Sequence, residues 1–184
     1  QILTVAKIKP QRVKTKVAPK TVAKLPPDPN TAAQKEKAST ALAGAAEVLL
    51  ERNEADTAIT YFRQAVALNP KNENAKLGLS EALTLKGDDT VAKRGAEWAL
   101  KFYEEAISFN DKNAAAHAAV AEVYDELRQK EKAISSYQKA LALSPELTEL
   151  NAPLGILLLQ SGEVAKAETY LIKATETNQN DAET

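Results

Sequence analysis

A helical hairpin in the second half of the chain constrains the fold more than any other feature. Within residues 114–147, apolar and small side chains recur at i, i+3, i+4 and i+7 in two runs, as on one face of an α-helix. A polar turn at 129–131 separates the runs, and Pro145 ends the second because proline cannot donate the next helical hydrogen bond. One hairpin cannot bury its own apolar face, so the pattern predicts neighbouring hairpins of the same kind.

Three further copies of the pattern occur, at a spacing of about 34 residues. In the copy from Ser39, the small or apolar positions are Leu42, Ala45, Ala46, Leu49, Ala58, Phe62, Ala65 and Pro70. In the copy from Thr148, they include Leu154, Gly155, Leu158, Ala167, Leu171 and Ala174. This pattern resembles the tetratricopeptide repeat family. The resemblance implies an all-α fold, a right-handed solenoid of stacked antiparallel helix hairpins.

Four repeats are expected, at 39–72, 73–113, 114–147 and 148–180, between an N-terminal arm at 1–38 and a tail at 181–184. The second repeat carries an insertion of about seven residues, close to two helical turns, within 88–95. We expect the insertion to lengthen the first helix of that repeat, and a longer surface loop is the alternative. Trp98, after the insertion, is expected on a stripe of side chains beside the packing face of the helix. The sequence is compatible with two roles for this stripe, contact with a partner and simple packing.

The N-terminal arm differs from the repeats in composition. Its five prolines exclude a long helix, and residues 12–17 alternate in polarity as a strand does. We expect an extended arm that either docks on a protein surface or is a solvated linker. The arm residues expected to contact a partner are Ile2, Val5, Ile8, Arg12, Val13 and Val17.

The net charge of −1 hides a separation of charge along the chain. Residues 1–27 carry seven Lys or Arg and no acidic side chain, whereas the remainder holds 17 basic and 25 acidic residues. Opposite charges on two parts of one chain favour contact between those parts, or between copies of the protein. The charge separation is therefore compatible with a separate protein partner and with self-association. Docking of the arm on another copy of the chain is one form of self-association.

In the resembled family, ligands meet the first helix of each hairpin at regular offsets. The resemblance implies that the partner-binding groove here consists of Ala43, Glu47, Leu50, Glu51, Asn74, Leu77, Glu81, Thr84, Ala118, Glu122, Asp125, Glu126, Ile156 and Leu159. These positions change from acidic to apolar along the chain and favour a basic or apolar extended segment. The Lys and Asn that clamp a carboxylate terminus in chaperone-binding members are absent. A solvated acidic face is the alternative interpretation.

No catalytic, cofactor-binding or metal-binding pattern is visible in the sequence. There is no cysteine, Gly-rich phosphate loop or His/Cys metal spacing, and the single histidine, His117, lacks catalytic companions. The acidic repeats would repel phosphate, which disfavours nucleic acid, and the longest apolar run, 152–159, is too short to span a bilayer. We therefore expect a non-enzymatic assembly scaffold without a cofactor. The alternative is an adaptor or chaperone that binds extended client peptides transiently.

The chain contains no methionine and begins at Gln1. This suggests a processed or trimmed product. Export from the cytoplasm and a cytosolic location both stay open, with export favoured.

Overall fold

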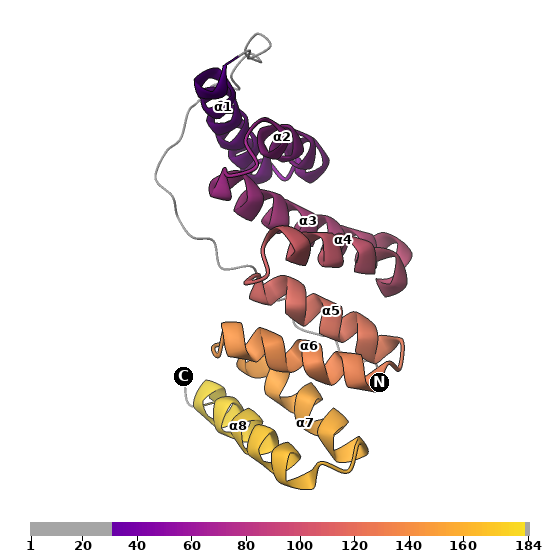
Figure 1. Ribbon diagram of the computed structural model, residues 1–184. Helices are drawn as coiled ribbons and strands as arrows, with labels where there is room; N and C mark the ends of the chain where they lie inside the picture. The colour runs from indigo at the N-terminus through magenta and orange to yellow at the C-terminus, as the bar shows by residue number, and fades with distance from the viewer. Residues whose placement is uncertain (1–30, 183–184) are drawn as a thin grey trace. The chain divides into compact units, whose positions relative to one another are not determined.

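The computed structural model describes the backbone of residues 31–182 and the side chains of residues 31–176. This part of the chain is all-α (Figure 1), with one short 3-10 helix, η1 (Thr148–Leu150). The α-helices are α1 (Ala32–Glu51), α2 (Ala55–Leu68), α3 (Glu73–Arg94), α4 (Ala96–Phe109), α5 (Ala114–Glu126), α6 (Lys130–Leu143), α7 (Asn151–Gln160) and α8 (Val164–Ala182). Consecutive helices form hairpins, so the all-α solenoid predicted from the repeats is confirmed. The chain divides into two compact units, residues 1–86 and 87–184, and the division falls inside α3.

The first unit contains α1, α2 and the part of α3 that ends at Lys86. A capping box starts α1: Thr31 Oγ1 accepts a hydrogen bond from the Gln34 amide at 3.2 Å, and the Gln34 side chain accepts one from the Thr31 amide at 2.9 Å. The buried ring of Phe62 in α2 lies against Gly78 of α3, where a Cβ atom would clash with the ring. Glycine at this position therefore lets α3 pack directly on the aromatic ring.

The start of α1 corrects the predicted arm boundary. Residues 32–38 form the first turns of α1, so the arm does not extend to residue 38. Residues 32–37 are exposed and show no apolar stripe. The capping box and good helix-forming residues, rather than burial, stabilise these turns.

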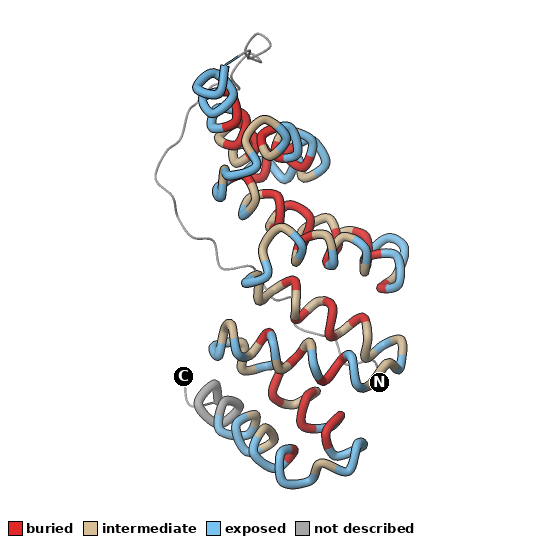
Figure 2. Tube along the Cα trace, in the orientation of Figure 1, coloured by how far each residue is buried: buried red, intermediate tan, exposed pale blue. Residues whose placement is uncertain are grey.

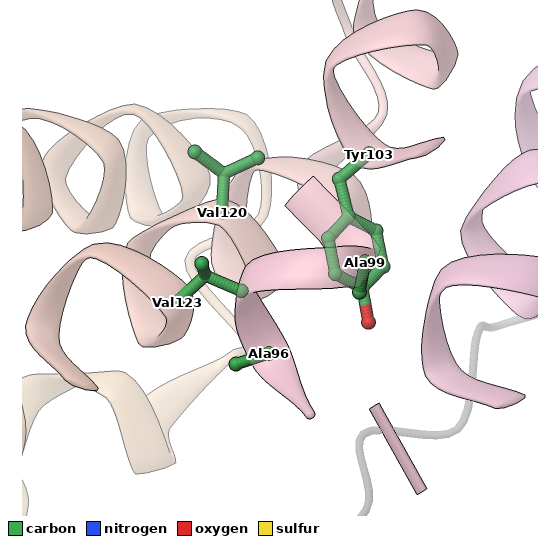
Figure 3. Close-up of a cluster of buried hydrophobic side chains, with 5 residues drawn as sticks. All are labelled: Ala96, Ala99, Tyr103, Val120 and Val123. Atoms are coloured by element: carbon green, nitrogen blue, oxygen red, sulfur yellow. The ribbon is translucent and has the colours of Figure 1, made fainter. Parts of the chain in front are cut away.

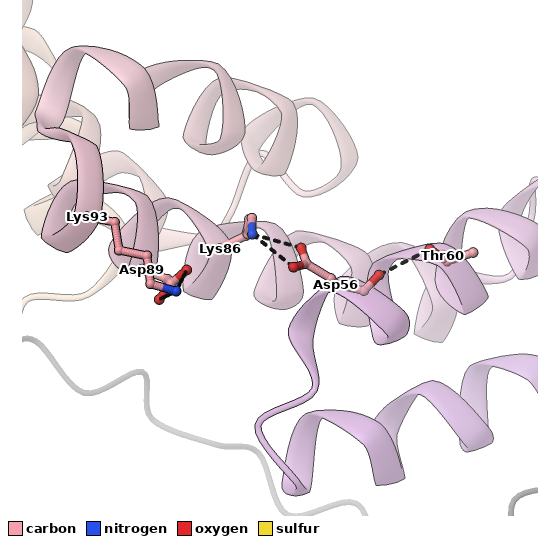
Figure 4. Close-up of polar contacts among 5 residues, drawn as sticks. All are labelled: Asp56, Thr60, Lys86, Asp89 and Lys93. Atoms are coloured by element: carbon pink, nitrogen blue, oxygen red, sulfur yellow. Dashed lines mark hydrogen bonds and ion pairs between the residues drawn. The ribbon is translucent and has the colours of Figure 1, made fainter.

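Polar side chains also connect the helices of the first unit. Ser39 Oγ of α1 donates a buried hydrogen bond to the Ala65 carbonyl of α2 at 2.7 Å, and it accepts one from Asn72 Nδ2 at 2.8 Å. Lys86 Nζ of α3 lies 2.9 Å from Asp56 Oδ1 of α2 (Figure 4). The buried hydrogen bond fixes the hairpin more strongly than the ion pair, because Asp56 is exposed to solvent.

The second unit begins with the last turns of α3. The helix runs unbroken to Arg94, so the insertion lengthens α3 rather than forming a loop, as the sequence analysis favoured. Gly95 then adopts a φ of +100°, a left-handed conformation that favours glycine, and α4 begins at the next residue.

The α4–α5 seam forms a hydrophobic cluster in the second unit (Figure 3). Ala96, Ala99 and Tyr103 of α4 bury their side chains with Val120 and Val123 of α5. Partly buried apolar residues that pack against this cluster are Leu100, Ile107, Ala119, Tyr124 and Leu127. Small residues on α4 let the two helices approach closely, and the tyrosine fills the remaining space.

The α7–α8 hairpin completes the second unit. α7 is only 10 residues long and follows η1, with Pro153 in its first turn, where the missing N–H costs no hydrogen bond. Leu154, Leu157 and Leu158 of α7 are buried, whereas most of the described residues of α8 are exposed or partly exposed (Figure 2). The last hairpin is therefore well packed on one side only.

Candidate functional site

In the first unit, the predicted groove residues divide into packed and accessible side chains. Ala43, Leu50 and Thr84 are buried, and the Thr84 hydroxyl donates a hydrogen bond to the Ser80 carbonyl at 2.9 Å. These three side chains stabilise the hairpins, so their prediction as partner contacts is not supported. The accessible residues of the set are Glu47, Glu51, Asn74, Leu77 and Glu81. Among them, Leu77 is 49% exposed.

In the second unit, the predicted residues of α5 lie beside a carboxylate from α3. Ala118 is fully buried and is a packing residue, while Glu122 and Asp125 are partly exposed and Glu126 is exposed. Burial raises the pKa of Glu122 to about 7, and the negative charges of Asp88 and then Glu149 contribute. The pKa of Tyr137 on α6 is also raised, first by its burial and then by the charges of Glu122 and Asp125.

Asp88, Glu122 and Asp125 thus form one group of carboxylates, called the acidic face below. Tyr103 of α4 donates a hydrogen bond to Asp88 Oδ1 at 2.8 Å, which holds that carboxylate in place. The sequence analysis missed Asp88 because it lies in the insertion, outside the family's offsets. The sequence did contain a signal for Asp88. It lies four residues after the predicted Thr84, and residues i and i+4 share one face of a helix.

The equivalent positions of α7 carry apolar side chains. Ile156 and Leu159 stand one repeat after Glu122 and Asp125. They are 50% and 45% exposed, respectively. We call these two residues the apolar pair. The change from acidic to apolar residues that the sequence predicted therefore persists among the accessible side chains of the second unit.

Trp98 lies on the solvent side of α4. Its side chain is 52% exposed, and the guanidinium carbon of Arg94 lies 4.4 Å from the centre of its ring. Stacking on arginine lowers the cost of exposing the indole. This contact fits both the surface-packing role and the partner-contact role that were left open.

The remaining predicted contacts, Ile2, Val5, Ile8, Arg12, Val13 and Val17, lie outside the described residues. Within residues 31–176, His117 Nε2 is 3.0 Å from the Asp111 carbonyl oxygen, and no group of His, Cys, Asp and Glu side chains could hold a metal ion. The helices of the described part are each too short or too polar to cross a membrane.

The successive helix hairpins define a helical repeat protein. Three tetratricopeptide repeat family models match the sequence, over residues 43–92, 114–147 and 131–183. The chain belongs to the tetratricopeptide repeat family. The family and the fold together support a protein–protein interaction role.

Solved structures with a similar fold include several of MamA. MamA from residue 41 to its end, from Desulfovibrio magneticus RS-1, has 21% sequence identity and a TM-score of 0.52, covering 81% of this chain and 80% of that one. A MamA RS-1 double mutant has 22% identity and a TM-score of 0.53, with coverages of 78% and 76%. A further MamA structure has 20% identity and a TM-score of 0.52, covering 83% of each chain. At this identity the similarity concerns the fold alone. No curated protein matches the sequence.

Proposed function

We propose that this protein is an assembly scaffold that holds a partner protein through an extended segment bound on α3, α5 and α7 of its second unit. The observation that carries the proposal is the pairing of the acidic face on α3 and α5 with the apolar pair on α7. A segment that binds both surfaces needs basic side chains to contact the acidic face and apolar side chains to contact the apolar pair. The proposal assigns binding, not catalysis, to the protein.

The raised pKa of Glu122 supports a cationic ligand group. Crowded carboxylates that are partly withdrawn from water repel each other, and an incoming Lys or Arg would relieve that repulsion. A cation that binds Glu122 should gain more free energy than one that binds a fully solvated carboxylate. Folding has already removed part of the water around Glu122, so binding has less water left to remove. This argument favours a partner contact over a simple solvated face for Glu122.

Exposed apolar side chains at the equivalent positions of the next repeat support the apolar half of the ligand. Ile156 and Leu159 would lose exposed surface on contact with a valine or leucine of the partner, at roughly 25 cal/mol for each Å² removed from water. Residues 1–27 of this chain have the required chemistry, with seven basic and no acidic side chains, so an arm from the chain itself is one such segment. Separate proteins with basic, apolar segments are the other source.

Purification from the native source at low and high salt tests the scaffold role. A stoichiometric partner or self-oligomer that stays bound through about 0.5 M salt, where charges are screened within about 4 Å, supports a scaffold. Partners that are lost on raising the salt support the alternative, a transient adaptor for extended client peptides.

A matched pair of variants connects that partner to the site. The double variant Glu122→Gln, Asp125→Asn should weaken the retained complex about tenfold, which corresponds to about 1.4 kcal/mol. Glu97→Gln, which removes an exposed carboxylate of α4, should leave the complex unchanged. Equal effects of the two changes would refute the assignment of the acidic face.

A further inference from the structure

The surface around Trp98 is explained by neither the acidic face nor the apolar pair. Trp98 is 52% exposed and comes directly before the buried Ala99 of α4. In the other repeats, the residue before the equivalent buried alanine is Thr57, Lys132 or Lys166, each of them polar and exposed. The second repeat therefore places a large apolar ring at a position that is otherwise polar. Because tryptophan is enriched among the residues that dominate binding at protein interfaces, this ring indicates a contact surface.

Two cations lie over neighbouring aromatic rings on this surface. The guanidinium carbon of Arg94 is 4.4 Å from the centre of the Trp98 ring, and Lys101 Nζ is 4.9 Å from the centre of the Phe102 ring. Trp98 and Phe102 are four residues apart in α4, so their side chains share one face of the helix. We call these four residues the cation–aromatic patch.

Both cations of the patch are available to an anion. In the described part of the chain, neither Arg94 nor Lys101 makes an ion pair. The neighbouring Lys93, by contrast, lies 2.8 Å from Asp89 Oδ1. A guanidinium that stacks on a ring keeps the N–H groups at its edge available to a carboxylate. A side chain already held over a ring also loses less freedom on binding than one that moves freely in water.

The insertion of the second repeat supplies part of this surface. Arg94 is the last residue of the lengthened α3, and Gly95, with a φ of +100°, lets α4 begin at the next residue. Val91 stands three residues before Arg94, on the same face of α3, and is 38% exposed. It adds apolar surface beside the Arg94 side chain. The patch is therefore a feature of the repeat that carries the insertion.

Acidic residues of α4 limit what can bind the patch. Glu97 and Glu104 are exposed, and Glu105 is partly exposed. A broad anionic lipid surface would approach these carboxylates together with the cations and would be repelled by them. A protein segment can place its own carboxylates at Arg94 and Lys101 alone. A segment of a protein therefore fits the patch better than a membrane does.

We infer that the cation–aromatic patch binds an acidic, apolar segment of a partner protein, with carboxylates at Arg94 and Lys101 and an apolar side chain on the Trp98 ring. This inference goes beyond the proposed function, because the ligand has the opposite charge and the contact uses other residues. A chain with both surfaces can hold two different partner segments. Failure of either proposal leaves the other standing.

The fluorescence of Trp98 tests the inference in the full chain, because no other tryptophan contributes. The probe is a synthetic peptide with the repeat Glu-Glu-Val-Val, in which each face of the extended peptide carries both carboxylates and apolar side chains. The peptide should shift the Trp98 emission to shorter wavelength along a saturating curve, because binding withdraws the ring from water. A Lys-Lys-Val-Val peptide should leave the emission unchanged, since Arg94 and Lys101 repel it.

Matched variants assign the binding to the two cations. The double variant Arg94→Gln, Lys101→Gln should bind the acidic peptide at least about tenfold more weakly, because two charged contacts are lost. Lys132→Gln is the control, since Lys132 is another exposed cation over a ring, 5.0 Å from the centre of Tyr124. It should leave the affinity unchanged. Circular dichroism of each variant confirms that the helices form.

Four results would overturn the inference. They are an emission that the acidic peptide never shifts, an equal shift by the lysine peptide, an equal loss of affinity in Lys132→Gln, and an unchanged affinity in the double variant. Vesicles of phosphatidylserine and phosphatidylcholine should leave the emission unchanged. A shift by these vesicles without a shift by the acidic peptide would assign the patch to a lipid surface instead.

Discussion

The third and fourth repeats share their packing positions and differ in the surfaces that they leave accessible. Ala133 and Ala167, one repeat apart, are both fully buried in the second helices of their hairpins. On the first helices, Glu122 gives way to Ile156, and Asp125 gives way to Leu159. The comparison teaches that small buried residues determine the hairpin, while the side chains between them are free to set what the hairpin recognises.

The two repeats also differ in the second helix of each hairpin. Tyr137 of α6 is buried, and Lys130 Nζ donates a hydrogen bond to the Gln160 carbonyl at the end of α7, at 3.1 Å. The equivalent residues of α8 are Leu171, which is partly exposed, and Val164, which is exposed. Equivalent positions of α6 and α8 therefore differ in how far their side chains are buried.

The largest expected effect compares these two helices directly. Tyr137→Ala should lower the free energy of unfolding by about 3–4 kcal/mol, because it removes a fully packed aromatic ring. Leu171→Ala should cost less, about 2 kcal/mol, because this side chain packs against Gly155 of α7 but stays partly exposed. Urea unfolding of both variants measures the difference. Equal costs would show that Leu171 is packed as completely as Tyr137.

The next effect concerns the acidic face and its dependence on pH. The folded-state pKa of Glu122, about 7, lies above the unfolded value, so the folded state binds more protons between the two. Glu122 therefore destabilises the fold fully above pH 7, and the cost is relieved as the pH falls toward the unfolded pKa of about 4.3. Glu122→Gln should stabilise the protein by about 1–2 kcal/mol near pH 8, less than the full shift implies because the side chain is partly exposed.

The same variant should have little effect near pH 4, where both states are protonated. The equivalent change in the fourth repeat, Ile156→Gln, should give no pH dependence and serves as the control. Thermal unfolding across this pH range checks both statements. A stability that rises with pH for the unchanged chain relative to Glu122→Gln would contradict the assigned pKa.

A smaller effect is expected at the start of the chain. Deletion of residues 1–30 should leave the helical content and the cooperative melt nearly unchanged, because the described residues bury apolar side chains of their own in every hairpin. Circular dichroism and a thermal melt measure this. Loss of the helical signal would show that the arm belongs to the core of the first unit.

The smallest effect is expected at the ion pair of the first unit. Asp56→Ala removes the contact to Lys86, and the cost should stay below about 1 kcal/mol because exposed pairs contribute little. Raising the salt concentration should abolish the difference between this variant and the unchanged chain. A cost comparable to that of Tyr137→Ala would place the pair among the core contacts.

The repeats could be predicted from the sequence because small and apolar residues recur at fixed offsets wherever helices bury a seam. The start of α1 could not be found in the same way, because residues 32–37 are exposed and have no apolar period. The signal that existed was the capping box, Thr31 followed by Gln34, which the periodicity search did not use.

The candidate site was predicted only in part. Family offsets led to Glu122, Asp125, Ile156 and Leu159, which are accessible in the structure. The same offsets also gave Ala43, Leu50, Thr84 and Ala118, which are buried, because an offset does not tell which neighbouring helix covers a residue. Asp88 was missed because the insertion moved it out of register. The exposure of Ile156 and Leu159 also required coordinates, since the sequence does not show which side chains of a helix are covered.

One titration tests most directly whether the acidic face and the apolar pair hold one extended segment. A synthetic peptide in which lysine and valine alternate should bind the chain more tightly near pH 8 than near pH 6, because Glu122 ionises between them and attracts the lysines. Calorimetry should show that this pH dependence disappears in Glu122→Gln and that Ile156→Ala weakens binding at both pH values. Binding that ignores both substitutions, or no binding at all, would contradict the account.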